Sequence, residues 1–404
     1  MASSIERRQF FTKAMAATAA VAASNPFARS EGAVPAAKKK HRVAIIGCGR
    51  MGQYFADVYR LIPETELVAI AEWNDERRPV VGKRFGVTAL YKDVHSMLRE
   101  VVPDLAVIVT PTKFMKDAVI ACAKAGVKGV STDKPMAATL ADADAMVDAC
   151  KKHGTIFSGG NLQRAKWTVQ NAAERLQTGE FGKIAGAAVH GFSGEISGGG
   201  CQHLCVLRLF ANAEVAEVLA WGSPEEAMKS KDDSGLNING RFRMTSGLEV
   251  QVFSENTPYS GVDVWTDDTL VRWDWDAPQI FQGTDSTGAR KEIDPKYPDF
   301  QWQDVLTATG FEKTYDYLVG SIRSFIRAVE AQDENLLWIS GHDLRQALEI
   351  AIASKLSAQL GNVPVKLPLA DRSLALYPSR YRWLGGDATG RPQDAKDAAG
   401  KKKS

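Results

Sequence analysis

Residues 41–52 read HRVAIIGCGRMG, and this stretch indicates how the first part of the chain folds. The apolar, β-branched run predicts a buried strand, and the residues from Met51 onward have helical spacing. Between them, Gly47, Gly49 and Gly52 follow the pattern GxGxxG. A helix that starts at such a turn offers free N–H groups to a phosphate. The stretch therefore predicts a strand–turn–helix unit with an anion site at the turn.

An acidic residue at the end of the next predicted strand extends this pattern. Glu72 ends the run ELVAIAE, about twenty residues after the glycines, where an acid accepts hydrogen bonds from the ribose of a dinucleotide. This placement favours NAD, but Arg77 and Arg78 leave NADP open because either is placed to reach a 2′-phosphate. The alternative is a glycine turn that binds nothing. The turn residues predicted to bind the cofactor are Gly47, Cys48, Gly49, Arg50, Met51 and Gly52.

Two domains are predicted from the order of the remaining elements. Short β-rich runs alternate with helical stretches over residues 41–160, which predicts an α/β domain with a doubly wound parallel sheet. After Gly160, strand-like runs follow one another with turn signals at Ser246-Gly247 and Asp267-Asp268. Residues 161–375 are therefore predicted to form an α+β domain with a large, mainly antiparallel open sheet. A helix from Gly341 to about Gly361 is expected to be the last ordered element.

The two ends of the chain are predicted to lie outside these domains. Residues 1–35 contain Arg7-Arg8 and a short alanine-rich run, and they resemble a twin-arginine signal, which sends folded proteins to the periplasm through its translocon. The alternative is a chance arginine pair in a disordered leader. The run is too short to span a bilayer, so no stable membrane insertion is expected. Residues 385–404 are polar and lysine-rich, which predicts a disordered tail.

The bulk composition excludes other classes of protein. The 404 residues carry a net charge of +2 without a long basic stripe, which argues against nucleic-acid binding. The five cysteines are too few and too irregularly spaced for a disulfide framework.

The tripeptide Asp133-Lys134-Pro135 ends another predicted strand, GVKGVST. Pro135 keeps Lys134 out of the helical region, so the lysine is fixed at a strand tip. The alternative is an ordinary surface lysine on a turn.

Five pieces of the sequence resemble, in order, the glucose–fructose oxidoreductase, inositol dehydrogenase and MocA (Gfo/Idh/MocA) family. They span about residues 41–360 and read VAIIGCGRMG, VIVTPT, AKAG followed by DKP, GGNLQRAKWTVQNAAERLQTGEFGKI, and SGHDLRQALEIAIASKLSA. The resemblance implies a Rossmann domain and a second domain with an open, mainly antiparallel sheet. It also implies NAD(P) at the strand tips of the first domain and a sugar or polyol substrate between the domains.

The resemblance also assigns roles to individual residues. Lys134 matches the lysine of the family's Glu-Lys-Pro motif, with Glu shortened to Asp133, and would polarise the reacting oxygen of the substrate. A fixed ammonium stabilises the negative charge that builds on that oxygen. The other residues placed by the resemblance are Thr110, Pro111 and Asp133 beside the cofactor, and Asn161 and Arg164 beside the substrate, although either of the latter two equally suits a capping or pairing role.

His203 is the predicted acid/base, but its surroundings depart from the family's pattern. It aligns with the family's histidine, whereas the aspartate expected four residues earlier is Gly199. Glu195 replaces that aspartate only if its loop folds back. Met115 also stands where the family often has a histidine. Two alternatives for His203 are a substrate contact without proton transfer and an ordinary residue at a helix start.

Two further clusters of residues also have simpler interpretations. Cys201, His203 and Cys205 suggest a metal, but His203 would point away from the cysteines on a helix and no second cluster supplies more ligands, so no metal is expected. Trp273 and Trp275 alternate along a predicted strand with both indoles on one face. Such a face suits a core, an oligomer interface or, less commonly, sugar stacking, and we expect a homo-oligomer (dimer or tetramer).

These features together predict an exported, NAD(P)-dependent oxidoreductase with a tightly held cofactor and a sugar, sugar derivative or polyol as substrate. One alternative is a glycoside hydrolase that uses bound NAD for transient oxidation, as some members of the family do. Another is a non-catalytic protein on the same scaffold.

Overall fold

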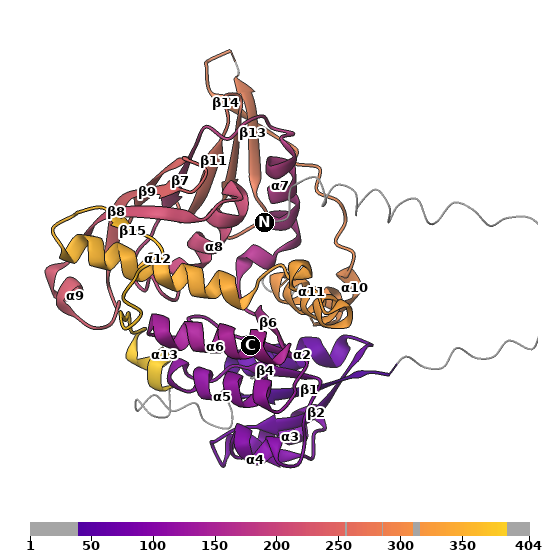
Figure 1. Ribbon diagram of the computed structural model, residues 1–404. Coiled ribbons are helices and arrows are strands. Elements are labelled where there is room, and N and C mark those ends of the chain that lie inside the picture. The colour runs from indigo at the N-terminus through magenta and orange to yellow at the C-terminus, as the bar shows by residue number, and fades with distance from the viewer. Residues whose placement is uncertain (1–38, 255–256, 285, 310–315, 386–404) are drawn as a thin grey trace, which may run out of the picture. The chain divides into compact units, whose positions relative to one another are not determined.

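Two β-sheets organise the chain in the computed structural model, which describes residues 39–254, 257–284, 286–309 and 316–385 (Figure 1). The first sheet has six strands in the order β3-β2-β1-β4-β5-β6. The second has nine strands in the order β14-β13-β12-β11-β7-β10-β9-β8-β15. The predicted signal peptide and the predicted tail after Gly385 lie outside the described residues.

The first sheet is parallel throughout its paired strands. Strands β4, β5 and β6 are buried at every residue, as expected of a sheet with helices on both faces. This arrangement confirms the predicted doubly wound sheet. Its elements are β1 (His41–Ile46), α2 (Arg50–Leu61), β2 (Thr65–Ala71), α3 (Arg77–Phe85), β3 (Leu90–Tyr91), α4 (Val94–Leu98), β4 (Leu105–Ile108), α5 (Thr112–Lys124), β5 (Gly129–Thr132), α6 (Leu140–His153) and β6 (Ile156–Gly159).

The second sheet is mainly antiparallel, with one parallel pair between β10 and β7. The turns predicted at Ser246-Gly247 and Asp267-Asp268 join β9 to β10 and β11 to β12 as hairpins, which confirms both predictions. Its strands are β7 (Gly186–His190), β8 (Val215–Ser223), β9 (Asn237–Met244), β10 (Glu249–Phe253), β11 (Gly261–Trp265), β12 (Thr269–Trp273), β13 (Gln279–Thr284), β14 (Arg290–Ile293) and β15 (Val365–Lys366).

Strand β12 ends earlier than the sequence alternation predicted. Trp273 is fully buried at its end, whereas Trp275 has a positive φ of 74° and is 40% exposed. The two indoles still lie close together, with ring centroids 5.4 Å apart. They do not form an exposed aromatic face, so this argument for an oligomer fails, and the homo-oligomer itself stays a prediction.

The helices of the second half were only partly predicted. The long helix α12 (Gly341–Gln359) starts as expected, capped by Ser340 and Asp343 in a reciprocal capping box. It is not the last ordered element, because β15 and α13 (Arg380–Leu384) follow it. The remaining helices are η1 (Gln163–Ala165), α7 (Trp167–Thr178), α8 (Gly200–Ala211), α9 (Glu225–Lys229), α10 (Gln303–Thr309), α11 (Asp316–Ala331) and η2 (Glu334–Leu336).

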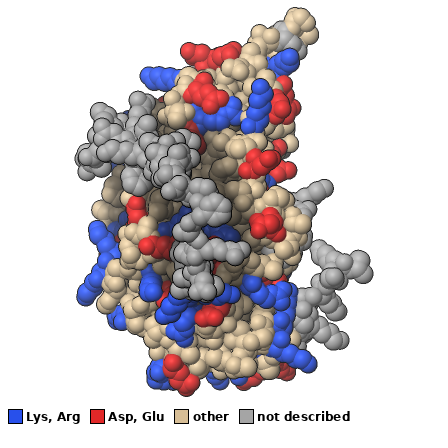
Figure 2. Space-filling view, turned by 90° about the vertical axis from the view of Figure 1, so that its right-hand side faces the viewer, with Lys and Arg blue, Asp and Glu red and all other residues tan. Residues whose placement is uncertain are grey.

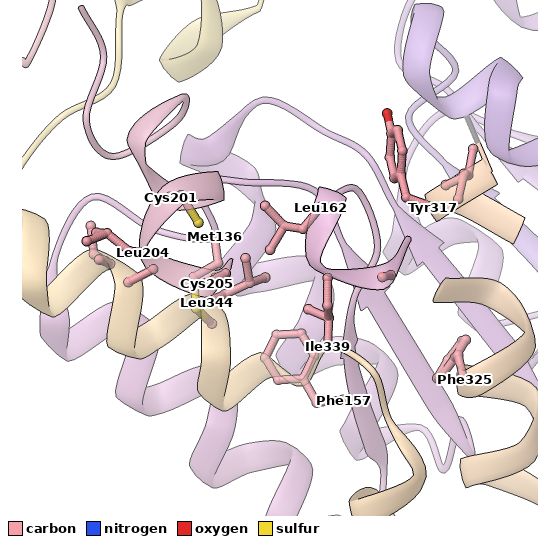
Figure 3. Close-up of a cluster of buried hydrophobic side chains, with 14 of the residues drawn as sticks. Met136, Phe157, Leu162, Cys201, Leu204, Cys205, Tyr317, Phe325, Ile339 and Leu344 are labelled. Atoms are coloured by element: carbon pink, nitrogen blue, oxygen red, sulfur yellow. The ribbon is translucent and has the colours of Figure 1, made fainter. Parts of the chain in front are cut away.

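Buried apolar side chains join the edge strand β6 of the first sheet to the helices of the second half (Figure 3). Phe157 of β6, Leu204 of α8 and Leu344 of α12 belong to this cluster. Contact is so close that a Cβ built on Gly159 would lie 2.9 Å from Leu344 Cδ1. The two halves therefore share one continuous apolar core.

The surface in Figure 2 carries acidic and basic side chains interspersed, so neither sign covers that face. Within the described ranges, no helix is both long and apolar enough to cross a membrane.

We expect Leu344→Ala to lower the free energy of unfolding by about 2–5 kcal/mol, because it leaves a cavity in this core. Leu344 is 2% exposed, whereas Leu360 at the end of α12 is 59% exposed. Leu360→Ala is therefore the matched control, with an expected change within about 0.5 kcal/mol. Urea denaturation followed by circular dichroism measures both. Equal effects of the two substitutions would contradict the placement of α12 in the core.

Candidate functional site

A cavity of about 380 Å³ opens at the carboxyl ends of β1 and β4. The strand order reverses between these neighbours, and α/β sheets bind ligands at such a point. The residues predicted to bind the cofactor line this cavity, with the exception of Cys48 and Gly52. The lining members of that set are Gly47, Gly49, Arg50, Met51, Glu72, Thr110, Pro111, Asp133 and Lys134.

The glycine turn has the geometry that its sequence predicts. Gly47 has φ +87°, and a Cβ there would lie 2.5 Å from the Val109 carbonyl oxygen. A Cβ on Gly52 would lie 2.0 Å from the Gly47 carbonyl oxygen, so helix α2 packs directly on the turn. The N-cap residue of α2 is Gly49, which makes no side-chain capping bond, and the first turn has no acidic residue. The helix start therefore presents its N–H groups and positive dipole end to the cavity.

A buried hydroxyl in the cavity wall has no partner among the described residues. Thr110 follows β4, and its Oγ1 is buried without a hydrogen bond. A buried polar atom of this kind indicates an unseen partner, such as a ligand or water. Together with the open helix start, this hydroxyl fits a dinucleotide that carries a pyrophosphate and many hydrogen-bonding groups.

Glu72 is held at the adjoining wall by three donors. Its Oε2 accepts from the Cys48 N–H at 2.7 Å, and its Oε1 accepts from the Asn74 N–H at 2.9 Å. The Arg77 guanidinium adds an ion pair at 3.2 Å, and both side chains are almost fully buried. Arg78 donates to the Glu72 carbonyl oxygen at 2.8 Å and to Asp75 at 2.6 Å. The two arginines considered for NADP are therefore both engaged with Glu72 or its neighbour.

Lys134 lines the cavity at the tip of β5, as predicted. The backbone N–H of Lys134 donates to Asp133 Oδ1 at 2.7 Å, and the same oxygen accepts from Asn161 Nδ2 at 3.0 Å. Burial lowers the pKa of the Lys134 ammonium, the Asp133 carboxylate opposes this shift, and the Arg382 guanidinium adds to it. The lysine therefore releases its proton more easily than a solvated lysine does.

The predicted substrate residues Asn161 and Arg164 do not line the cavity. Asn161 is 8% exposed and lies behind Asp133, where its Oδ1 accepts from the Tyr317 hydroxyl at 3.0 Å. Arg164 donates to the Trp338 carbonyl oxygen at 3.0 Å and pairs with Asp343 at 3.1 Å. Asn161 thus joins the end of β5 to α11, whereas Arg164 makes its bonds within the second half of the chain.

His203 is also outside the cavity lining, so the structure does not bring the predicted acid/base to Lys134. It is 2% exposed, and its Nε2 lies 2.9 Å from Ser260 Oγ. Its ring lies edge-on to Trp273 and Trp275, with centroids 5.7 and 5.6 Å away. Burial lowers the pKa of His203 to about 4, so the ring is neutral near pH 7.

Residues from a late segment of the chain complete the cavity wall and were not predicted. Ser379, Tyr381, Arg382 and Gly385 line it beside Glu195. Glu195 was considered only as a partner of His203, but it pairs with Arg382 instead. The aromatic and basic run RYRWL at residues 380–384 was the available signal.

Cys201 and Cys205 interact with each other, since a hydrogen bond to Cys205 and burial raise the pKa of the Cys201 thiol. Among the described residues, no group of three or more His, Cys, Asp or Glu side chains is placed to hold a metal.

We expect His203→Gln to reduce the loss of stability in acid. The unfolded chain protonates this histidine below about pH 6.5, whereas the folded protein resists protonation down to about pH 4. Stability from this residue is therefore present at pH 7 and falls by about 3 kcal/mol as the pH drops to 4. Urea titrations at pH 7 and pH 4 on both proteins measure the difference. Parallel losses in the two proteins would show that His203 is not buried as a neutral ring.

Comparison with known proteins relates residues 41–161 to an NAD-binding oxidoreductase family. Residues 41–161 match the family GFO_IDH_MocA, described as "Oxidoreductase family, NAD-binding Rossmann fold". Myo-inositol 2-dehydrogenase of Thermotoga maritima is 32% identical over 142 residues, which are 35% of this chain and 42% of that protein. D-apiose dehydrogenase of Paraburkholderia graminis is 33% identical over 144 residues, or 36% and 38% of the two chains. The matched stretch thus spans less than half of each relative.

The solved structures extend the likeness to both sheets. A probable dehydrogenase from Thermotoga maritima superposes with a TM-score of 0.62 at 25% identity, over 81% of this chain and 98% of that chain. Residues 41–161 therefore match the NAD-binding Rossmann model of the Gfo/Idh/MocA oxidoreductase family, and the likeness in fold to a probable dehydrogenase extends over most of the chain.

Proposed function

We propose that this protein is an NAD(P)-dependent oxidoreductase that transfers a hydride between a tightly bound nicotinamide cofactor and a sugar, sugar derivative or polyol. The observation that carries the proposal is that the glycine turn, Thr110 and Lys134 line one cavity, and that the Thr110 hydroxyl has no hydrogen-bond partner among the described residues. The relatives named above act on myo-inositol and D-apiose, a polyol and a sugar, which supports this substrate class.

Glu72 and the start of α2 would hold the dinucleotide. The helix start suits the pyrophosphate, and the carboxylate at the end of β2 suits the ribose hydroxyls. A carboxylate repels a 2′-phosphate, and the nearby Arg77 and Arg78 are already paired. We therefore propose NAD as the preferred cofactor.

Lys134 would handle the proton of the reacting alcohol. A bound nicotinamide would supply the acceptor or the donor of the hydride that is exchanged with the carbinol carbon. As the hydride leaves the carbinol carbon, the neutral amine of Lys134 takes the hydroxyl proton and becomes an ammonium ion. In the reverse direction, the ammonium ion returns that proton to the substrate oxygen. The lowered pKa of Lys134 suits both steps because it brings the proton exchange closer to neutral pH. His203 has no part in this scheme.

The protein is further proposed to act in the periplasm after twin-arginine export, with its cofactor bound before export. The Arg7-Arg8 leader supports this location.

We expect Lys134→Met to lower kcat/KM about 10²- to 10⁴-fold, because the substrate oxygen loses its proton partner. Binding of NAD is expected to change by less than about threefold, since the glycine turn and Glu72 are untouched. Reduction of NAD with myo-inositol and D-apiose as probes, together with NAD titration calorimetry, measures both quantities.

Lys116→Met is the matched control, because Lys116 is an exposed lysine on α5 paired with Asp142. It should behave as the unmodified protein. Full turnover by Lys134→Met would rule out the assigned role of Lys134.

A further inference from the structure

The last described segment of the chain returns from the second sheet to the cavity. After β15, Arg372 forms an ion pair with Asp144 of α6 at 2.6 Å and another with Glu349 of α12 at 2.5 Å. The Leu376 N–H then donates to the Ala138 carbonyl oxygen at 2.8 Å, which leads the chain along the first domain. Helix α13 follows and places Arg382 in the cavity wall. Two ion pairs and a backbone hydrogen bond therefore hold this segment beside the site.

Arg382 is joined there to Glu195, which comes from the loop between β7 and α8. Glu195 Oε2 accepts from Arg382 Nε in an ion pair, and Oε1 accepts from the Ser379 N–H at 2.9 Å. The side chain of Glu195 is 17% exposed and that of Arg382 is 35% exposed. One carboxylate thus binds both the guanidinium and the backbone at the start of α13.

The space for this pair depends on a glycine. A Cβ on Gly198 would lie 2.5 Å from Glu195 Oε2 and 3.3 Å from Arg382 Nε. Gly198 has no positive φ in this structure, so its backbone conformation does not require glycine. A side chain at this position would instead take up space that the ion pair occupies. Gly198 therefore leaves room for the ion pair in this loop.

Lys134, Glu195 and Arg382 line the same cavity, so both charges of the pair lie on its wall together with the lysine. The charged and titratable groups that face Lys134 are Asp133 beside it, Glu195 on the loop, Cys201 on α8 and Arg382 on α13. Cys201 stays a neutral thiol because its pKa is raised well above its usual range. Glu195 favours the ammonium form of Lys134 and Arg382 disfavours it.

We propose that Glu195 and Arg382 are positioning residues that hold α13 over the Lys134 end of the cavity and place one charge of each sign beside this lysine. Neither residue touches the reacting atoms in this scheme. They act through the lysine, and they do so with opposite signs. The inference rests on the proposed function, in which Lys134 exchanges a proton with the substrate, but the pKa of Lys134 can be measured without turnover.

The test is competitive labelling of the full-length protein with acetic anhydride across a range of pH, without any substrate. Only the neutral amine reacts, so the pH dependence of labelling in the Lys134 peptide, read by mass spectrometry, reports its pKa. Arg382→Met removes a cation and is expected to shift the labelling curve to higher pH. Glu195→Gln removes an anion and is expected to shift it to lower pH. Arg382→Lys keeps the positive charge, so its Lys134 labelling curve is expected to lie close to that of the unmodified protein.

Lys355 supplies an internal control in the same digests. It is a partly buried lysine on α12, where burial lowers its pKa and Asp233 and Asp232 oppose the shift. Its curve should be the same in all variants. Unchanged Lys134 curves in both Arg382→Met and Glu195→Gln would overturn the proposal, as would shifts in the same direction, which loosening of α13 alone produces.

This outcome is separable from the proposed function. Opposite shifts of the two labelling curves without any dehydrogenase activity would support the electrostatic role of Glu195 and Arg382 and contradict the proposed reaction. Turnover with unchanged labelling curves would support the reaction and contradict the electrostatic role.

Discussion

The hydrogen bond from the Cys48 N–H to the Glu72 carboxylate is the contact on which the site depends. It ties the glycine turn after β1 to the end of β2, while Gly47 sits against the carbonyl of Val109 after β4. Three neighbouring strand tips are thereby fixed relative to one another. The uncapped start of α2 then faces a cavity rather than another part of the protein. Backbone hydrogen bonds from Gly47 to Ala71 and from Val109 to Ile46 act beside this contact at the same strand ends.

Much of this half could be predicted because its signals are local. Glycine spacing, an acid at a strand end and a proline after Lys134 each constrain the backbone nearby, and these residues do meet at one cavity. The fate of His203 was not predictable, because its burial under Trp273 and Trp275 depends on a bend after β12 where Trp275 takes a positive φ. No periodic pattern in the sequence marks that bend.

The wall formed by α13 escaped prediction for a different reason. Its helix has only five residues, too short for a periodic signal, and its position depends on ion pairs of Arg372 with Asp144 and Glu349, far apart in sequence. Glu195 was visible as a candidate acid, but its partner Arg382 lies 187 residues away. The result is a site whose lysine belongs to a recognisable motif, while the charges that tune it come from segments that the motif does not include.

The proposed function requires that this cavity holds a dinucleotide. Native mass spectrometry of the protein purified from the cells that produce it tests this directly, because a tightly held cofactor survives transfer to the gas phase and is identified by its mass. We predict one NAD per chain, lost when Gly47→Val places a side chain against the Val109 carbonyl. Protein that arrives empty and takes up neither NAD nor NADP when they are added would contradict the central claim.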